Sequence, residues 1–142
     1  MNKLEYIPGD IVKIEYGEAT GKIGFVTNTF LRRKGCYSLV VFIGKGFQGS
    51  SKDDWIQTYN DEVSPIPLTP EILEKNGWKD DGYDWYRLPT KRAYLYITKD
   101  ITTLGEFLVC VGLDRHNLAS INFVHQLQHL LFGLNINYEM EV

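Results

Sequence analysis

Residues 117–135 read NLASINFVHQLQHLLFGLN and form the longest run with helical periodicity in the 142-residue chain. Apolar residues recur in this run at intervals of three and four, which predicts an amphipathic helix over about residues 118–134. At about 100° per residue, six of the apolar side chains fall on one side of the helix, which we expect to face the core. These residues are Phe123, Val124, Leu127, Leu130, Leu131 and Leu134.

The opposite side of this helix carries His125 and His129, with Ile121 and Phe132 beside them. We term these four residues the histidine face, and the sequence leaves two interpretations of it open. An exposed face with aromatic and histidine anchors would suit a protein partner or a second copy of the chain. In a small two-part protein, the N-terminal part would instead pack against this face.

The segment His125-Gln-Leu-Gln-His129 has the histidine spacing of a zinc-protease helix. Such a helix also needs a glutamate after the first histidine, which activates the metal-bound water. Gln126 occupies that position and cannot act as a base, and no third ligand follows at the usual spacing. We therefore predict no enzyme activity, cofactor or metal; a two-histidine metal site without catalysis is the remaining alternative.

The composition, with 44% hydrophobic and 23% charged residues, suits a globular protein with one sizeable core or two small ones. No apolar run approaches the roughly 20 residues that cross a bilayer, and the first residues lack the apolar segment of a signal peptide. We expect a cytoplasmic protein without a membrane partner, or one associated with a virion. Cys36 and Cys110 lie in separate apolar runs, and we expect two reduced, buried thiols.

Residues 9–26, GDIVKIEYGEATGKIGFV, combine alternating apolar residues with four glycines. Two short strands joined by a tight loop account for this pattern, and Gly24 indicates a bulge or a close backbone approach. The segment resembles the KOW motif of SH3-like barrels in ribosomal proteins and transcription elongation factors. The resemblance implies an SH3-like β-barrel over residues 1–66, a fold that binds RNA, DNA, proteins or nothing.

A nucleic-acid-binding function would use Arg32, Arg33 and Lys34 for phosphates, with the ring of Phe30, Tyr37 or Phe47 for stacking. The alternative is a solvated hairpin turn whose charges protect a sheet edge. Residues 1–66 contain 8 Lys or Arg and 8 Asp or Glu, and residues 67–142 contain 7 and 10. Neither half is basic, which argues against tight, non-specific nucleic-acid binding.

Prolines at 65, 67 and 70 mark a boundary, because each restricts the preceding residue to extended conformations. Thr69 has the character of a helix cap, and we expect a short helix over residues 70–76 that stops at Gly77, followed by Trp78 in the core. Aromatic and β-branched runs at 83–88, 93–97 and 106–111 predict strands of an antiparallel meander.

Three segments of the C-terminal half carry a second resemblance: PIPLTPEIL at 65–73, NGW at 76–78 and FVHQLQHL at 123–130. They are similar to a family of small proteins encoded by Bacteroidetes and by their phages and prophages. This chain has His129 where that family has asparagine, and Trp78 where it has phenylalanine. The resemblance implies a phage or mobile-element setting and no particular activity.

We therefore predict an α+β protein with two domains. Residues 1–66 would form the SH3-like β-barrel, and residues 67–142 a small antiparallel sheet with one short and one long helix. The expected function is non-catalytic binding or assembly in a phage or mobile element, through protein–protein contacts at the histidine face. The alternative is a KOW-type module that binds RNA or DNA.

Overall fold

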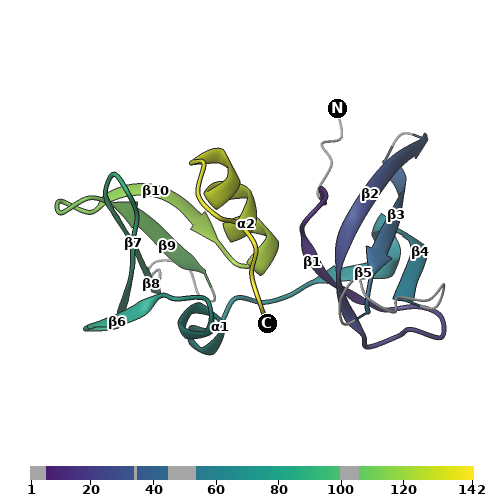
Figure 1. Cartoon of the computed structure of the whole chain (residues 1–142), viewed down its shortest axis with the longest axis horizontal. Coiled ribbons are helices and arrows are strands. Elements are labelled where there is room, and N and C mark those ends of the chain that lie inside the picture. The colour runs from purple at the N-terminus through teal and green to yellow at the C-terminus, as the bar shows by residue number, and fades with distance from the viewer. Residues whose placement is uncertain (1–5, 34, 45–53, 100–105) are drawn as a thin grey trace. The chain divides into compact units, whose positions relative to one another are not determined.

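The computed structural model of the chain describes residues 6–33, 35–44, 54–99 and 106–142. The chain divides into two compact units, Met1–Ile66 and Pro67–Val142. Each unit is organised around one antiparallel sheet of five strands (Figure 1). The α-helices among the described residues are one of six and one of ten residues, both in the second unit. The expected α+β fold class is therefore wrong, because strands dominate both units.

The first sheet has the strand order β4-β3-β2-β1-β5. Its strands are β1 (Ile11–Ile14), β2 (Ile23–Arg33), β3 (Cys36–Phe42), β4 (Trp55–Tyr59) and β5 (Val63–Pro65). Among the described residues, β4 and β5 form the two edges and do not pair, so the expectation of a closed barrel is wrong. β5 has only 3 residues and ends in Pro65, which lacks an N–H, so it offers few groups for closing a ladder.

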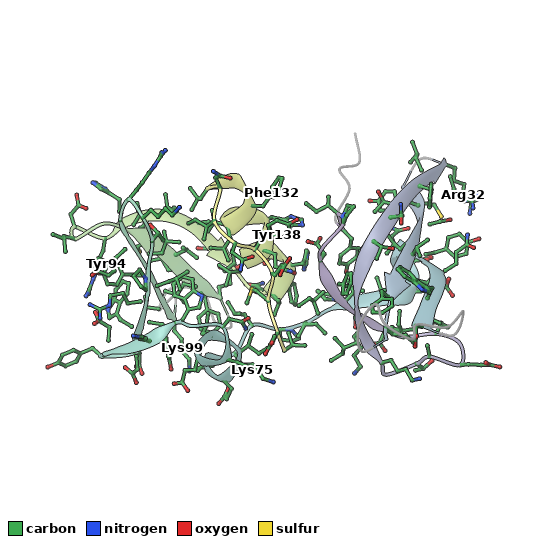
Figure 2. The ribbon with its side chains drawn as sticks, viewed as in Figure 1. Arg32, Lys75, Tyr94, Lys99, Phe132 and Tyr138 are labelled. Atoms are coloured by element: carbon green, nitrogen blue, oxygen red, sulfur yellow. The ribbon has the colours of Figure 1, made fainter. Side chains whose placement is uncertain are left out.

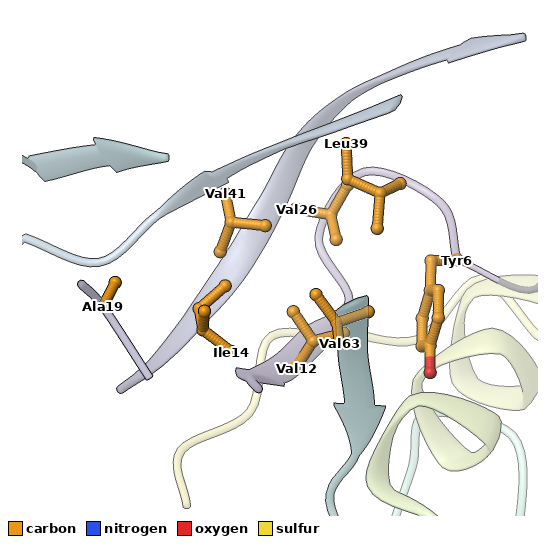
Figure 3. Close-up of a cluster of buried hydrophobic side chains, with 8 residues drawn as sticks. All are labelled: Tyr6, Val12, Ile14, Ala19, Val26, Leu39, Val41 and Val63. Carbon is orange, nitrogen blue, oxygen red and sulfur yellow. The ribbon is translucent and has the colours of Figure 1, made fainter. Parts of the chain in front are cut away.

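The core of the first unit lies on one face of this sheet (Figure 3). Its buried residues are Tyr6, Val12, Ile14, Ala19, Val26, Leu39, Val41 and Val63. Gly24 lies beside this core, where a Cβ would come within 2.3 Å of the carbonyl oxygen of Phe42. The close backbone approach expected at Gly24 is confirmed, whereas the bulge of β2 falls later, between Val26 and Asn28.

The second sheet is a meander with the order β10-β9-β8-β7-β6, which confirms the expected antiparallel topology. Its strands are β6 (Lys79–Gly82), β7 (Trp85–Pro89), β8 (Tyr94–Lys99), β9 (Phe107–Val111) and β10 (His116–Ile121). β10 occupies residues whose periodicity predicts a helix. Ser120 pairs with Leu108 and Ile121 with Phe107, so this segment gains a ladder with β9 that is interrupted by one irregularity between Asn117 and Ala119.

The short helix α1 (Pro70–Lys75) begins as its sequence predicts. The Oγ1 of Thr69 accepts a hydrogen bond from the N–H of Ile72 at 3.2 Å, and Pro70 takes the first helical position. Gly77 follows the helix with a φ of 89°, a conformation that favours glycine. Local residue chemistry therefore determines both ends of this helix.

The second helix, α2 (Val124–Gly133), begins later than the expected residue 118. Gln126 fixes this start, because its Oε1 accepts hydrogen bonds from the N–H of Asn122 at 2.7 Å and of Phe123 at 3.1 Å. The side chain thus satisfies two backbone donors that a helix start leaves without partners. The residue that stands where a zinc protease has its glutamate is a structural cap in this protein.

The buried face of α2 differs from the expected one. It consists of Val124, His125, Leu127, Gln128 and Leu131. Leu134, which we expected in the core, is 41% exposed. Gln128 can be buried because its Nε2 donates to the carbonyl of Tyr138 at 3.1 Å, which satisfies a polar group away from water. His125, which the sequence places opposite the apolar stripe, is buried as well.

Candidate nucleic-acid interface

Strands β2, β3 and β4 have a second face, opposite to the core of the first unit. Residues directly opposite each other in an antiparallel ladder project to the same side, and alternate positions along a strand project to opposite sides. Val41 pairs with Val26 and Ile56 on the core side. We call each set of three residues paired across β2, β3 and β4 a rung. The rungs on either side of the Val41 rung project outwards, and we term the surface formed by the outward-facing rungs the outer face. They are Phe25–Phe42–Trp55, Asn28–Val40–Gln57 and Phe30–Ser38–Tyr59.

The first rung of the outer face is entirely aromatic. The ring centroid of Phe42 lies 5.4 Å from that of Phe25 and 4.6 Å from that of Trp55. Phe42 is only 3% exposed, whereas Phe25 and Trp55 are 36% and 38% exposed. One buried ring thus supports two rings that reach solvent, an arrangement that suits stacking against nucleobases.

The third rung places two further aromatic rings on the same face. Phe30 is 50% exposed and Tyr59 is 44% exposed, and they flank the buried Ser38. The two aromatic rungs are four residues apart along β3, or roughly 13 Å at about 3.3 Å per residue. Between them, Asn28 and Gln57 expose amide groups that can hydrogen-bond to bases or sugars.

Arg32 adds a cation at the end of the outer face, where β2 approaches its hairpin with β3 (Figure 2). Its Nε donates to the Oγ of Ser38 at 2.8 Å. Among the described residues, neither Arg32 nor Arg33 takes part in an ion pair. The charges of both guanidinium groups are therefore available to an anion from solution.

An open cavity of about 810 Å³ adjoins the outer face at this end. It is lined by Tyr16, Arg32, Arg33, Cys36, Tyr59, Asp61 and Glu62. Arg32 and Tyr59 belong to both the cavity and the outer face, so the two surfaces are continuous.

The 3-10 turn η2 (Asn60–Glu62) supplies both acids of the cavity and is held in place by backbone and side-chain hydrogen bonds. The Oδ1 of Asn60 accepts from the N–H of Tyr37 at 3.0 Å, and its Nδ2 donates to the carbonyl of Gly35 at 3.3 Å. On the other side, the N–H of Glu15 donates to the carbonyl of Glu62 at 3.0 Å. The turn is thereby fixed to the β2–β3 hairpin and to the residues after β1.

The structure brings together only part of the nucleic-acid contacts expected from the sequence. Arg32 and Arg33 both line the cavity. Tyr37 is buried and pairs with Leu31, so its side chain projects to the core side of β3 and not to the outer face. The exposed ring next to the cavity is that of Tyr59, which pairs with Ser38 on the outer face. Phe30 lies on the outer face, and Lys34 and Phe47 lie outside the described residues. Sequence reasoning missed Trp55 and Tyr59, although the alternation of Trp55, Gln57 and Tyr59 is a signal that could have found them.

The histidine face is not one continuous exposed surface. Ile121 is 5% exposed and His125 is 2% exposed, His129 is half-buried, and Phe132 is 59% exposed. The ring of His125 stacks on that of Phe123 with centroids 6.0 Å apart and meets His129 edge-on at 5.5 Å. Of the four residues, only Phe132 presents most of its ring to solvent.

The second unit carries another group of arginine and aromatic side chains. The guanidinium of Arg115 lies over the ring of Trp85 at 4.3 Å and over that of Tyr96 at 4.9 Å. Arg87 and Arg115 each approach a carboxylate oxygen of Asp81 at 3.7 Å. Because these cations already have a carboxylate and aromatic partners, this group is better suited to stabilising the sheet than to binding an anion.

Neither a protein-family model nor a curated protein or solved structure matches the chain. The similarities to a phage-associated family and to the KOW sequence motif therefore stay predictions. Among the described residues, no helix has the length and apolar character needed to cross a membrane.

Proposed function

We propose that this protein is a non-catalytic binding protein that holds single-stranded nucleic acid on its outer face. The observation that carries the proposal is the placement of Phe25, Phe30, Trp55 and Tyr59 on one side of a three-stranded surface, each at least one-third exposed. Exposed aromatic rings on a sheet stack on unpaired bases, whose planes are accessible in single strands and covered in duplexes.

The electrostatics of the first unit favour binding of moderate strength. Residues 1–66 have equal numbers of acidic and basic residues, so the unit supplies no general attraction for a polyanion. Arg32 and Arg33 share their cavity with Asp61 and Glu62, but both are exposed and neither forms an ion pair within the described residues, so each can contact a phosphate. Neutralising two phosphates of a single strand predicts a salt dependence of log K with a slope of about −1.4.

Fluorescence anisotropy with a labelled ten-nucleotide strand, in RNA and DNA forms and over a salt series, tests the proposal. We expect salt-dependent binding of both single strands and weaker binding of the corresponding duplex. Phe30→Ala should weaken binding by about 1–3 kcal/mol, the usual effect of removing one stacking ring. Leu31→Ala is the matched control, because Leu31 is 75% exposed and lies on the other side of the same strand. Absence of salt-dependent binding at low ionic strength would overturn the proposal.

A protein–protein contact at Phe132 is the second candidate function, and it corresponds to an assembly role in a phage or mobile element. The exposed ring of Phe132 is held edge-on by Tyr138, with centroids 5.2 Å apart, and Leu134 is 41% exposed nearby in the sequence. Phe132→Asp should lower the solution mass of a self-associating protein or abolish co-purification of a partner. Tyr83→Asp, at a 99% exposed ring, is the control. If the unsubstituted protein is a monomer in solution and co-purifies with no partner, this candidate function is contradicted.

A further inference from the structure

We propose that the cavity at the end of the outer face binds one guanine base of the strand, an inference that rests on the proposed single-strand binding. The cavity carries charges of both signs from two elements, with Arg32 and Arg33 at the end of β2 and Asp61 and Glu62 in η2. No ion pair joins these groups within the part of the chain that the structure describes. A ligand with a single charge would be attracted by either the two arginines or the two acids and repelled by the other two side chains. The cavity therefore fits a ligand with an anion at one end and hydrogen-bond donors at the other.

Guanine in a nucleic-acid strand has both features. Its Watson–Crick edge carries two adjacent donors, N1–H and the 2-amino group, which match the two oxygens of one carboxylate. Adenine, cytosine, uracil and thymine each present at least one acceptor at the corresponding positions, which a carboxylate repels. Hydrogen bonds to an ionised acceptor are also stronger than those between neutral groups. Asp61 and Glu62 therefore favour guanine over the other bases.

The remaining cavity residues fit the rest of a nucleotide. Tyr16 is 65% exposed and Tyr59 is 44% exposed, so both rings can contact the plane of a base. Arg32 and Arg33 can contact the adjoining phosphate, and the Ser38 hydrogen bond limits the orientations of Arg32. Because Arg32 and Tyr59 also form part of the outer face, a strand stacked there can place its next base in the cavity. This continuity favours a base within a strand over a free nucleotide.

Anisotropy titrations with four strands test the base preference. One is a labelled oligothymidine, and the others carry a single guanine, hypoxanthine or adenine at the centre. We expect the guanine strand to bind about tenfold more tightly than oligothymidine, within the range for a bidentate base contact. Hypoxanthine keeps N1–H and lacks the 2-amino group, so its strand should fall in between, and adenine should give no gain. Equal affinities for all four strands would overturn the guanine inference and leave single-strand binding intact. Failure to bind any strand would overturn both.

Guanosine monophosphate distinguishes a free nucleotide from a base within a strand. At about ten times the dissociation constant of the guanine strand, a nucleotide of equal affinity would displace most of the labelled strand. We expect guanosine monophosphate to displace little of it, because the nucleotide lacks contacts with the outer face. Displacement of most of the strand at that concentration would assign the cavity to a free nucleotide and contradict the inference.

The carboxylates are tested by the double substitution Asp61→Asn with Glu62→Gln. This variant should bind the guanine strand more weakly and oligothymidine more tightly, because the guanine contact and the repulsion of phosphates are lost together. Glu18→Gln, at an exposed acid outside the cavity, should leave the ratio of the two affinities unchanged. A loss of folding would weaken binding of both strands and is checked by circular dichroism. An unchanged affinity ratio in the folded double variant would contradict the inference.

Discussion

The Nε of Arg32 donates to the Oγ of Ser38 at 2.8 Å, and Ser38 is completely buried within the third rung of the outer face. The bond holds one N–H of the guanidinium and leaves the remaining N–H groups for an external acceptor. Arg32 therefore contributes both a charge and a preferred orientation, and substitutions can separate the two contributions.

Arg32→Gln should reduce the slope of log K against log salt by about 0.7, because one phosphate contact is lost. Arg32→Lys keeps the charge and cannot form the same Nε hydrogen bond, so we expect a weaker affinity with an unchanged slope. Anisotropy over a salt series measures both quantities. Lys22→Gln removes an exposed cation outside the cavity and serves as the control. A similar change of slope in the Lys22 variant would indicate diffuse attraction and contradict a specific role of Arg32.

Gly24→Ala should lower the free energy of unfolding by about 1–3 kcal/mol, the usual effect of overpacking. The added Cβ would lie 2.3 Å from the Phe42 carbonyl oxygen and 2.9 Å from the Val41 Cγ1, so β2 and β3 must separate. Urea unfolding measures the change. Gly133→Ala is the control, because a Cβ there meets nothing within 4 Å among the surrounding atoms. Equal stability of the Gly24 variant and the parent would show that the two strands can shift without loss.

The two cysteines should differ in reactivity towards a thiol reagent. Cys36 is half-buried and lines the cavity, whereas Cys110 is 1% exposed and its Sγ donates to the Oδ1 of Asn117 at 3.3 Å. Burial raises the pKa of the Cys110 thiol, and Arg115 opposes the shift only in part, so at neutral pH less of the reactive thiolate is present. We expect one thiol to react in the folded protein and the second only after unfolding. In the folded protein, Cys36→Ser should remove the reaction of this first thiol. Loss of that reaction in Cys110→Ser instead would show that Cys110, and not Cys36, is the accessible thiol.

Gln126→Ala should destabilise the second unit by about 1 kcal/mol, because two backbone N–H groups lose their acceptor. Gln126→Glu should preserve stability, since a carboxylate accepts the same bonds and is favoured near a helix N-terminus. Thermal unfolding of the two variants measures the difference. Equal destabilisation by alanine and glutamate would show that the amide has another role.

The sequence predicts well those parts of the fold that neighbouring residues determine. Thr69 and Pro70 define the start of α1, and Trp78 is buried at 2% exposure as expected. The limit of this reasoning lies where a distant partner decides the structure. Residues 118–121 have helical periodicity, yet pairing with β9 draws them into β10. Their backbone groups gain a ladder there, which outweighs a weak local preference.

The candidate site shows the same limit. Clustered cations in the sequence indicate Arg32 and Arg33, but the choice of Tyr37 as the stacking ring depended on which side of β3 that residue occupies. Side chains alternate along a strand, so an error of one position selects a core residue in place of a surface residue. Trp55 joins the site only because β4 pairs with β3 in this register. Local patterns do not specify that register.

β3 supplies core residues and outer-face residues in alternation: Leu39 and Val41 are fully buried, and Phe42 supports the aromatic rung on the other side. A shift of its register by one residue would exchange the two sets, exposing aliphatic side chains and turning the aromatic support inwards. The pairing register of β3 therefore determines both the core of the first unit and its outer face. Insertion or deletion of a single codon within β3 would therefore remove both at once.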